Sequence, residues 1–195
     1  MRNLAIILLI SCLTALADSP APPEPRLTVS ASNRFAFSML PPHWNSKGDI
    51  TRQPFGTAYE LQDDGSFRSL WRVTGWYAFQ CFLSDDGRYL VRMGGWAVGK
   101  QPSKQDLAVA FYDRGKLLKQ FSTADLVKDK TKVVASTSHY LWLACETVQF
   151  GPDRDQKRTE PPPTLVDDTF QLKTCDGIEY TFDIKTGKIT DTKGA

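Results

Sequence analysis

The sequence predicts a mainly all-β fold: an antiparallel meander of hairpins that forms an open curved sheet or a two-sheet sandwich with blade-like units. Apolar residues recur at every second position over long stretches, which is the spacing of a pleated strand. Turn glycines, each preceded within two residues by Asp or Lys, separate these stretches: Gly65, Gly87, Gly115, Gly177 and Gly187. A single capping-box spacing, Ser122 to Asp125, predicts one short helix near 123–128.

The clearest hairpin spans residues 76–93. Apolar residues alternate along its first arm at Tyr77, Phe79, Cys81 and Leu83, and along its second arm at Tyr89, Val91 and Met93. Asp85-Asp86-Gly87 lies between the arms, and Gly87 supplies the positive backbone angle that a tight turn needs.

The rest of the chain gives further strands in order. A first strand is expected in 27–39 and a loop over 43–54. In the hairpin that follows, Phe67, Ser69, Trp71 and Val73 are expected to share one face. The remaining expected strands are 57–61, 107–112, 117–121, 138–146, 170–174, 178–182 and 188–190.

The N-terminal residues predict export. One positive charge precedes an almost continuous apolar run over 4–16, and Ala15-Leu16-Ala17 is a small-x-small cleavage site, so residues 1–17 resemble a signal peptide. The run is too short to span a bilayer, and no transmembrane segment is expected after processing. An alternative is a lipoprotein box ending at Cys12, which would make a lipid-anchored envelope protein.

A proline-rich tether is expected over 18–26, then a single β-rich domain over 27–195 with a mobile polar loop at 151–163. The chain carries 24 Lys and Arg against 22 Asp and Glu. This balance argues against a nucleic-acid partner, because such proteins present a broad basic surface.

The order of several segments between Cys81 and Trp142 carries a resemblance. The segments are 82–91, Gly94-Gly95-Trp96, 107–113, 115–118 and 136–142. In this order they resemble a scattered group of uncharacterised exported bacterial proteins that look like isolated β-propeller blades. The resemblance implies a blade-like fold and export, and it implies no activity and no catalytic residue.

The sequence contains no pattern typical of catalysis or metal binding. A serine hydrolase needs Ser, His and Asp to converge, and no G-x-S-x-G turn accompanies His43 or His139. The paired carboxylates at 63–64, 85–86 and 167–168 lack the ligand ladder of a calcium loop and fit turns better. No catalytic residue, metal site or cofactor is therefore expected.

Two tryptophans and two cysteines are the candidate site residues. Trp44 and Trp96 lie in or beside expected loops, where an aromatic ring either contacts a ligand or partner or caps the core. Three cysteines follow the leader. A disulfide between Cys145 and Cys175 is the favoured pairing, and the alternative is three buried reduced thiols.

We therefore expect an exported protein that acts as a non-enzymatic binding or interaction module of the cell envelope or secreted fraction. Its partner is unknown, and an envelope protein or a glycan would fit exposed aromatic residues. The alternatives are a small extracytoplasmic hydrolase, which would need a histidine beside a carboxylate in a cleft, and the lipid-anchored lipoprotein.

Overall fold

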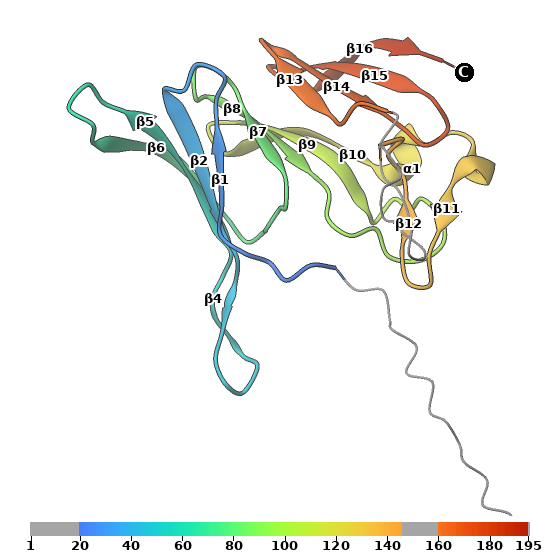
Figure 1. The fold of residues 1–195 in the computed structure, drawn as a ribbon, viewed down its shortest axis with the longest axis horizontal. Coiled ribbons are helices and arrows are strands. Elements are labelled where there is room, and N and C mark those ends of the chain that lie inside the picture. The colour runs from blue at the N-terminus through green and yellow to red at the C-terminus, as the bar shows by residue number, and fades with distance from the viewer. Residues whose placement is uncertain (1–19, 146–159, 195) are drawn as a thin grey trace, which may run out of the picture.

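The computed structural model describes residues 20–145 and 160–194, and the predicted leader over 1–17 lies outside these ranges. Three four-stranded antiparallel sheets follow one another along the described chain (Figure 1). The all-β antiparallel class with one short helix is confirmed, and the hairpins are distributed over three sheets. Such four-stranded meanders are the units from which β-propeller blades are made.

The first sheet has the order β1-β2-β5-β6, with bounds Arg26–Val29, Phe35–Leu40, Phe55–Leu61 and Phe67–Thr74. A separate hairpin, β3 (His43–Trp44) with β4 (Ile50–Arg52), leaves this sheet between β2 and β5 and projects beyond its end (Figure 1).

The central sheet has the order β10-β9-β8-β7, with β7 at Cys81–Leu83, β8 at Tyr89–Met93, β9 at Leu107–Asp113 and β10 at Lys116–Ser122. The third sheet contains β13 (Thr164–Val166), β14 (Thr169–Lys173), β15 (Glu179–Asp183) and β16 (Lys188–Lys193) in chain order.

Short elements connect the central and third sheets. The helix α1 spans Thr123–Leu126 and begins with the predicted capping box, in which Ser122 and Asp125 bond each other's backbone N–H. A 3₁₀ turn at Lys130–Lys132 and a small hairpin, β11 (Val134–Ala135) with β12 (Tyr140–Leu141), follow. No helix among the described residues is long and apolar enough to cross a membrane.

Three local predictions were wrong. The expected first strand over 27–39 is two strands, because Asn33 adopts a left-handed backbone (φ 58°) and turns the chain between β1 and β2. The expected loop over 43–54 contains the β3–β4 hairpin. The first arm of the 76–93 hairpin is regular only from Cys81, since Tyr77 instead bonds its hydroxyl to the backbone of Glu24.

The predicted strand over 138–146 is likewise shorter than expected. Only Tyr140–Leu141 forms a strand, and an isolated bridge joins Leu143 to Thr174. Most of the predicted loop over 151–163 lies outside the described residues.

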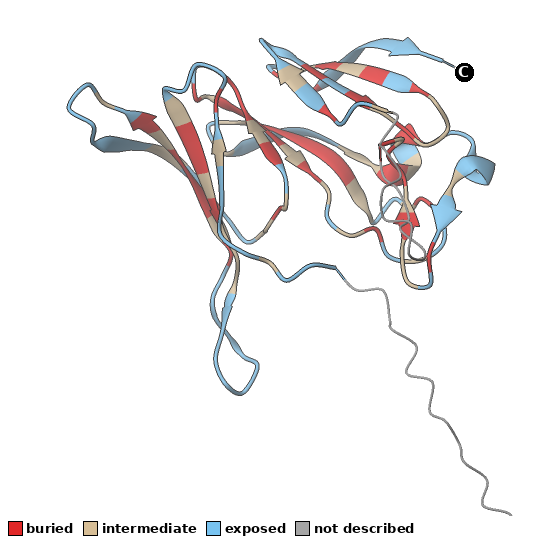
Figure 2. Cartoon of the chain, in the orientation of Figure 1, coloured by how far each residue is buried: buried red, intermediate tan, exposed pale blue. Residues whose placement is uncertain are grey.

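The core has two parts, one on each face of the central sheet (Figure 2). Along β9, Val109 and Phe111 pack toward the third sheet, whereas Ala110 and Tyr112 pack toward the first sheet. Residues 108–112 are all buried. A strand buried on both faces belongs in the middle of a layered structure, and β9 holds the two outer sheets together.

Replacing Phe111 tests this role. Its fully buried ring lies 5.2 Å from the ring of Phe182 and 6.1 Å from that of Phe170, between centroids. Phe111→Ala is expected to lower the free energy of unfolding by about 3–5 kcal/mol, because it removes apolar contact and leaves a cavity. Urea denaturation would measure this. Leu117→Ala, at an exposed β10 position, is the control and should change stability by less than about 0.5 kcal/mol.

An ion pair at the end of β8 and β9 makes part of the stability depend on pH. Arg88 donates from Nε and Nη2 to the two carboxylate oxygens of Asp113, at 2.8 and 2.7 Å. These bonds lower the pKa of Asp113 in the folded protein. The stabilisation is therefore fully present above the pKa of the unfolded state and is lost as the pH falls through the folded pKa.

We predict that the urea midpoint of the native protein falls more steeply on acidification below about pH 4 than that of Asp113→Asn. Equal slopes for the two proteins would contradict a contribution from this ion pair.

Candidate functional site

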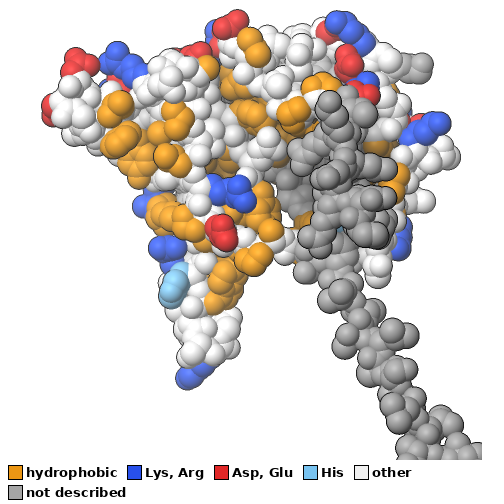
Figure 3. Space-filling view, viewed as in Figure 1, with side chains coloured by type: hydrophobic (Ala, Val, Ile, Leu, Met, Phe, Trp, Pro, Cys, Tyr) orange, Lys and Arg blue, Asp and Glu red, His pale blue; other side chains and the backbone are white. Residues whose placement is uncertain are grey.

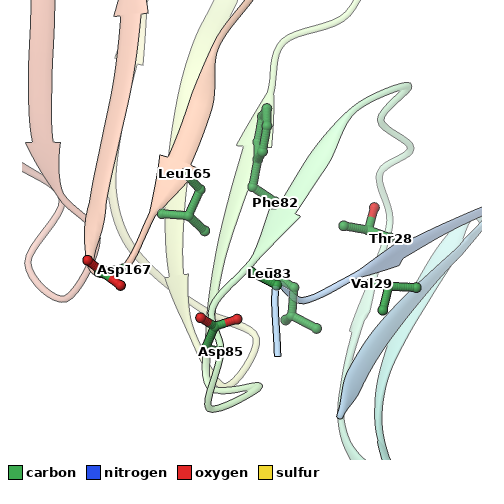
Figure 4. A pocket seen from close by; sticks show the side chains of 8 residues that line it. Thr28, Val29, Phe82, Leu83, Asp85, Leu165 and Asp167 are labelled. Carbon is green, nitrogen blue, oxygen red and sulfur yellow. The ribbon is translucent and has the colours of Figure 1, made fainter. Parts of the chain in front are cut away.

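The first strands of the three sheets lie together, since β7 contacts both β1 and β13. A pocket of about 200 Å³ opens among them (Figure 4). Phe82 and Leu83 from β7 and Leu165 from β13 form its apolar wall, and Thr28 and Val29 border it along the edge of β1. Asp85 and Asp167, each just beyond a strand, lie at its polar end.

This pocket is small, and the carboxylate of Asp85 has a structural role. Its volume is below the roughly 300–1,000 Å³ of typical small-molecule sites. Asp85 accepts the backbone N–H of Ser32 at 2.8 Å, which fastens the β1–β2 turn to the central sheet. The described residues hold no group of three or more His, Cys, Asp or Glu side chains that could bind a metal ion. The pocket therefore shows how the sheets converge and does not by itself indicate chemistry.

A larger feature is the face of the first sheet that points away from the central sheet, here called the open face. Residues paired across an antiparallel sheet share a face. Val29 pairs with Ala36, Ala36 with Tyr59 and Leu61 with Phe67. The full set on this face comprises Leu27, Val29, Ala36, Ser38, Leu40, Phe55, Thr57, Tyr59, Leu61, Phe67, Ser69, Arg72 and Thr74.

The open face exposes apolar side chains. Leu27 is 67% exposed, Phe67 62%, Val29 50% and Leu61 38%. Hydrophobic side chains gather over this part of the molecule (Figure 3). Arg72 stacks its guanidinium 3.8 Å from the ring centre of Phe55, and Arg52 covers the same ring. Contiguous apolar surface of this kind marks a place where another surface packs.

The outward face of the third sheet has the opposite character. Gln171 pairs with Thr181, Thr181 with Asp191 and Lys173 with Glu179 across this face. Lys173 also forms ion pairs with Glu160 and Glu179. Val166 is an isolated exposed apolar residue there. The third sheet thus shows the ordinary alternation of a sheet with one face in water, and the first sheet does not.

Trp44 lies on the β3–β4 hairpin, not in a loop, and is 46% exposed, and its contact with a ligand or partner stays a prediction. Ile50, its partner across the hairpin, is also exposed. The neighbouring His43 places Nδ1 2.7 Å from Oγ1 of Thr51, a contact within the hairpin. The projecting hairpin therefore carries its own small apolar surface beside the open face.

Trp96 is half-buried, and its ring lies 3.7 Å from that of His139, between centroids. Nδ1 of His139 is 2.5 Å from Oγ of the buried Ser136. The same Oγ accepts the backbone N–H of His139, as expected for a side chain that closes a turn. Trp44 and Trp96 belong to different parts of the fold, and the structure does not bring them together.

The cysteines lie in or beside the core. Cys81 and Cys145 are buried, and Cys175 is partly buried. Among the described residues no two cysteines lie at disulfide distance, so the pairing of Cys145 with Cys175 remains a prediction. Burial raises the pKa of the Cys81 thiol to about 12, because the thiolate loses its hydration.

The buried Cys81 should therefore resist alkylation. At roughly pH 8 we expect its reaction with iodoacetamide in the folded protein to be at least about a thousandfold slower than that of an ordinary thiol of pKa ~8.5. Peptide mass spectrometry would measure the modified fraction, with the guanidinium-unfolded chain as the control. Similar rates in the folded and unfolded states would contradict the burial.

Comparisons with known proteins leave the function open. No family model matches the chain, and no curated protein matches it. Among solved structures, a Dos1 propeller is similar with a TM-score of 0.38 and 12% identity, over 88% of this chain and 36% of that one. The periplasmic gluconolactonase PpgL of Pseudomonas aeruginosa has a TM-score of 0.33 and 18% identity, over 87% of this chain and 56% of its own. This chain thus spans between about a third and about half of those proteins.

The open face was missed by reasoning from the sequence. Its signal was present in residues 55–61, where Phe55, Tyr59 and Leu61 share one face while Gly56 and Ala58 lie on the other, so apolar residues occur on both faces of this strand. A second signal was hidden by a β-bulge at Leu70. Ala58 pairs with Trp71 but Tyr59 pairs with Ser69, so Phe67 lies on the opposite face from Trp71 and Val73. The prediction that these residues share a face was therefore wrong.

Proposed function

We propose that this protein is an exported, non-enzymatic interaction module that binds another protein chain through the open face of its first sheet. The observation that carries the proposal is the contrast between two terminal sheets of one molecule. The first exposes Leu27, Val29, Leu61 and Phe67, whereas the third presents paired charges and amides to water.

The chemistry of the open face favours a protein partner over a glycan. Its exposed side chains are mostly aliphatic or phenyl groups, which gain free energy by leaving water and offer no hydrogen bonds to sugar hydroxyls. Another sheet or an apolar protein surface can pack on them at about 10 Å, as sheets do in sandwiches.

Export is supported by the leader-like residues 1–17, with cleavage after Ala17. Use of Cys12 as a lipid-bearing first residue would place the same module on a membrane surface. The proposal that the protein is not an enzyme is supported by the contact between His139 and Ser136. The Ser136 hydroxyl also bonds the backbone of His139, so it has a local structural role.

Site-specific photo-crosslinking in the host cell tests the proposal. A benzophenone amino acid placed at Phe67 should form adducts with a protein chain, while the same group at Val166 should form few. Val166 is the matched control because it is 64% exposed, close to the 62% of Phe67, and lies on the polar face of the third sheet.

Adducts at both positions in similar yield, or at neither, would contradict docking on the open face. Phe67→Asp should also lower the adduct yield of a probe at Leu27 by at least tenfold, because it places a charge within the apolar surface. Because both residues are exposed, circular dichroism of the variant should match that of the native protein.

A further inference from the structure

We infer that the open face binds the open face of a second copy of this chain, in a symmetric dimer whose two-fold axis runs across the strands. This rests on the proposed function, since it names the partner of the same surface.

The two terminal sheets exclude a head-to-tail arrangement. In such a dimer or ring, the open face of one copy would cover the outward face of the third sheet of the next. Lys173, Glu179 and Gln171 would then be buried against Leu27, Val29 and Phe67, at the cost of desolvating charged groups that gain no polar contact from the apolar face. The apolar surface that matches the open face is the open face of a second copy. The same residues then lie on both sides of the contact, which is therefore isologous.

The ends of the open face carry opposite charges. Arg72 and Arg52 lie at the end where β5 begins, both over Phe55. Asp63 and Asp64 form the exposed β5–β6 turn at the other end. The two ends are roughly 20 Å apart along β5, from the rise of about 3.4 Å per residue.

This polarity selects one of the two possible symmetric arrangements. A two-fold axis along the strands would keep the arginine-bearing end of one copy over the same end of the other. An axis across the strands, level with Glu60, instead places Arg72 of each copy beside Asp63 of the other, because Arg72 pairs with Thr57 and so lies as far before Glu60 as Asp63 lies after it. The same rotation sets Leu61 of one copy over Tyr59 of the other, so apolar side chains meet apolar side chains.

The projecting hairpin enlarges the contact. Four strands spaced by about 4.8 Å and some seven residues long give a footprint of only about 450 Å² per copy. Stable interfaces bury about 1,200 Å² or more in total. The β3–β4 hairpin extends beyond the Arg52 end, where the β5–β6 turn of the other copy would lie, and it exposes Trp44 and Ile50. The dimer therefore requires the two hairpins to supply the remaining area, about 300 Å² in total.

Charge reversal tests the arrangement. Sedimentation of the purified protein at about 10–100 μM should show a dimer. Arg72→Glu and Asp63→Lys, each alone, should weaken it at least tenfold, because each places two like charges together at both ends of the interface. Mixing the two single variants should restore a dimer of one copy of each, in which every end again pairs opposite charges. Asp64 is left unchanged because it accepts the Ser66 N–H within its turn.

Lys188→Glu, a reversal on the polar face of the third sheet, is the control and should leave the dimer unchanged. Arg72→Glu also removes a stack on Phe55, so its circular dichroism is checked; Asp63→Lys keeps that stack and tests the interface independently. A monomeric native protein at 100 μM, single variants that remain dimeric, or a mixture that stays monomeric would each overturn the dimer. Crosslinks from Phe67 to a chain of different mass would then still support the proposed function.

Discussion

Burial of the central sheet on both faces is the constraint on which the rest of this structure depends. Its strand β9 has no side that can face water, because Phe111 and Val109 fill one core and Tyr112 and Ala110 the other. The first sheet packs on one of these two faces and the third sheet on the other. Close approach is helped at Gly87, where the left-handed turn (φ 68°) leaves no room for a Cβ against the ring of Phe35.

The first and third sheets differ in the side chains on their outer faces. The third sheet ends the layered stack with Lys, Glu, Asp and Thr side chains, a surface that is stable in water. The first sheet keeps apolar groups outside as well as inside, with Arg72 and Arg52 shielding only Phe55. A layered structure with one polar and one apolar outer face differs between its two sides in what it can bind.

Local signals in the sequence predicted most of the elements. The five turn glycines named from the sequence all have positive φ, and the capping box starts the helix as expected. What failed depends on pairing between strands. The bulge at Leu70 arises from the register in which β6 pairs with β5, and no residue type in 67–74 predicts it. Asn33 turns the chain within the short polar segment 30–34, which was included in one strand because apolar residues flank it on both sides. The open face was hidden for the same reason, since a face is a property of the sheet.

The chain order of the sheets has a consequence for biosynthesis. The first sheet is complete at Thr74, before the strands that cover its inner face have been made. Until β9 has left the ribosome, this sheet has apolar residues on both faces and free strand edges. Slow elongation between residues 74 and 113 would thus leave a nascent chain that needs a holding chaperone. The polar third sheet, made last, carries no comparable hazard.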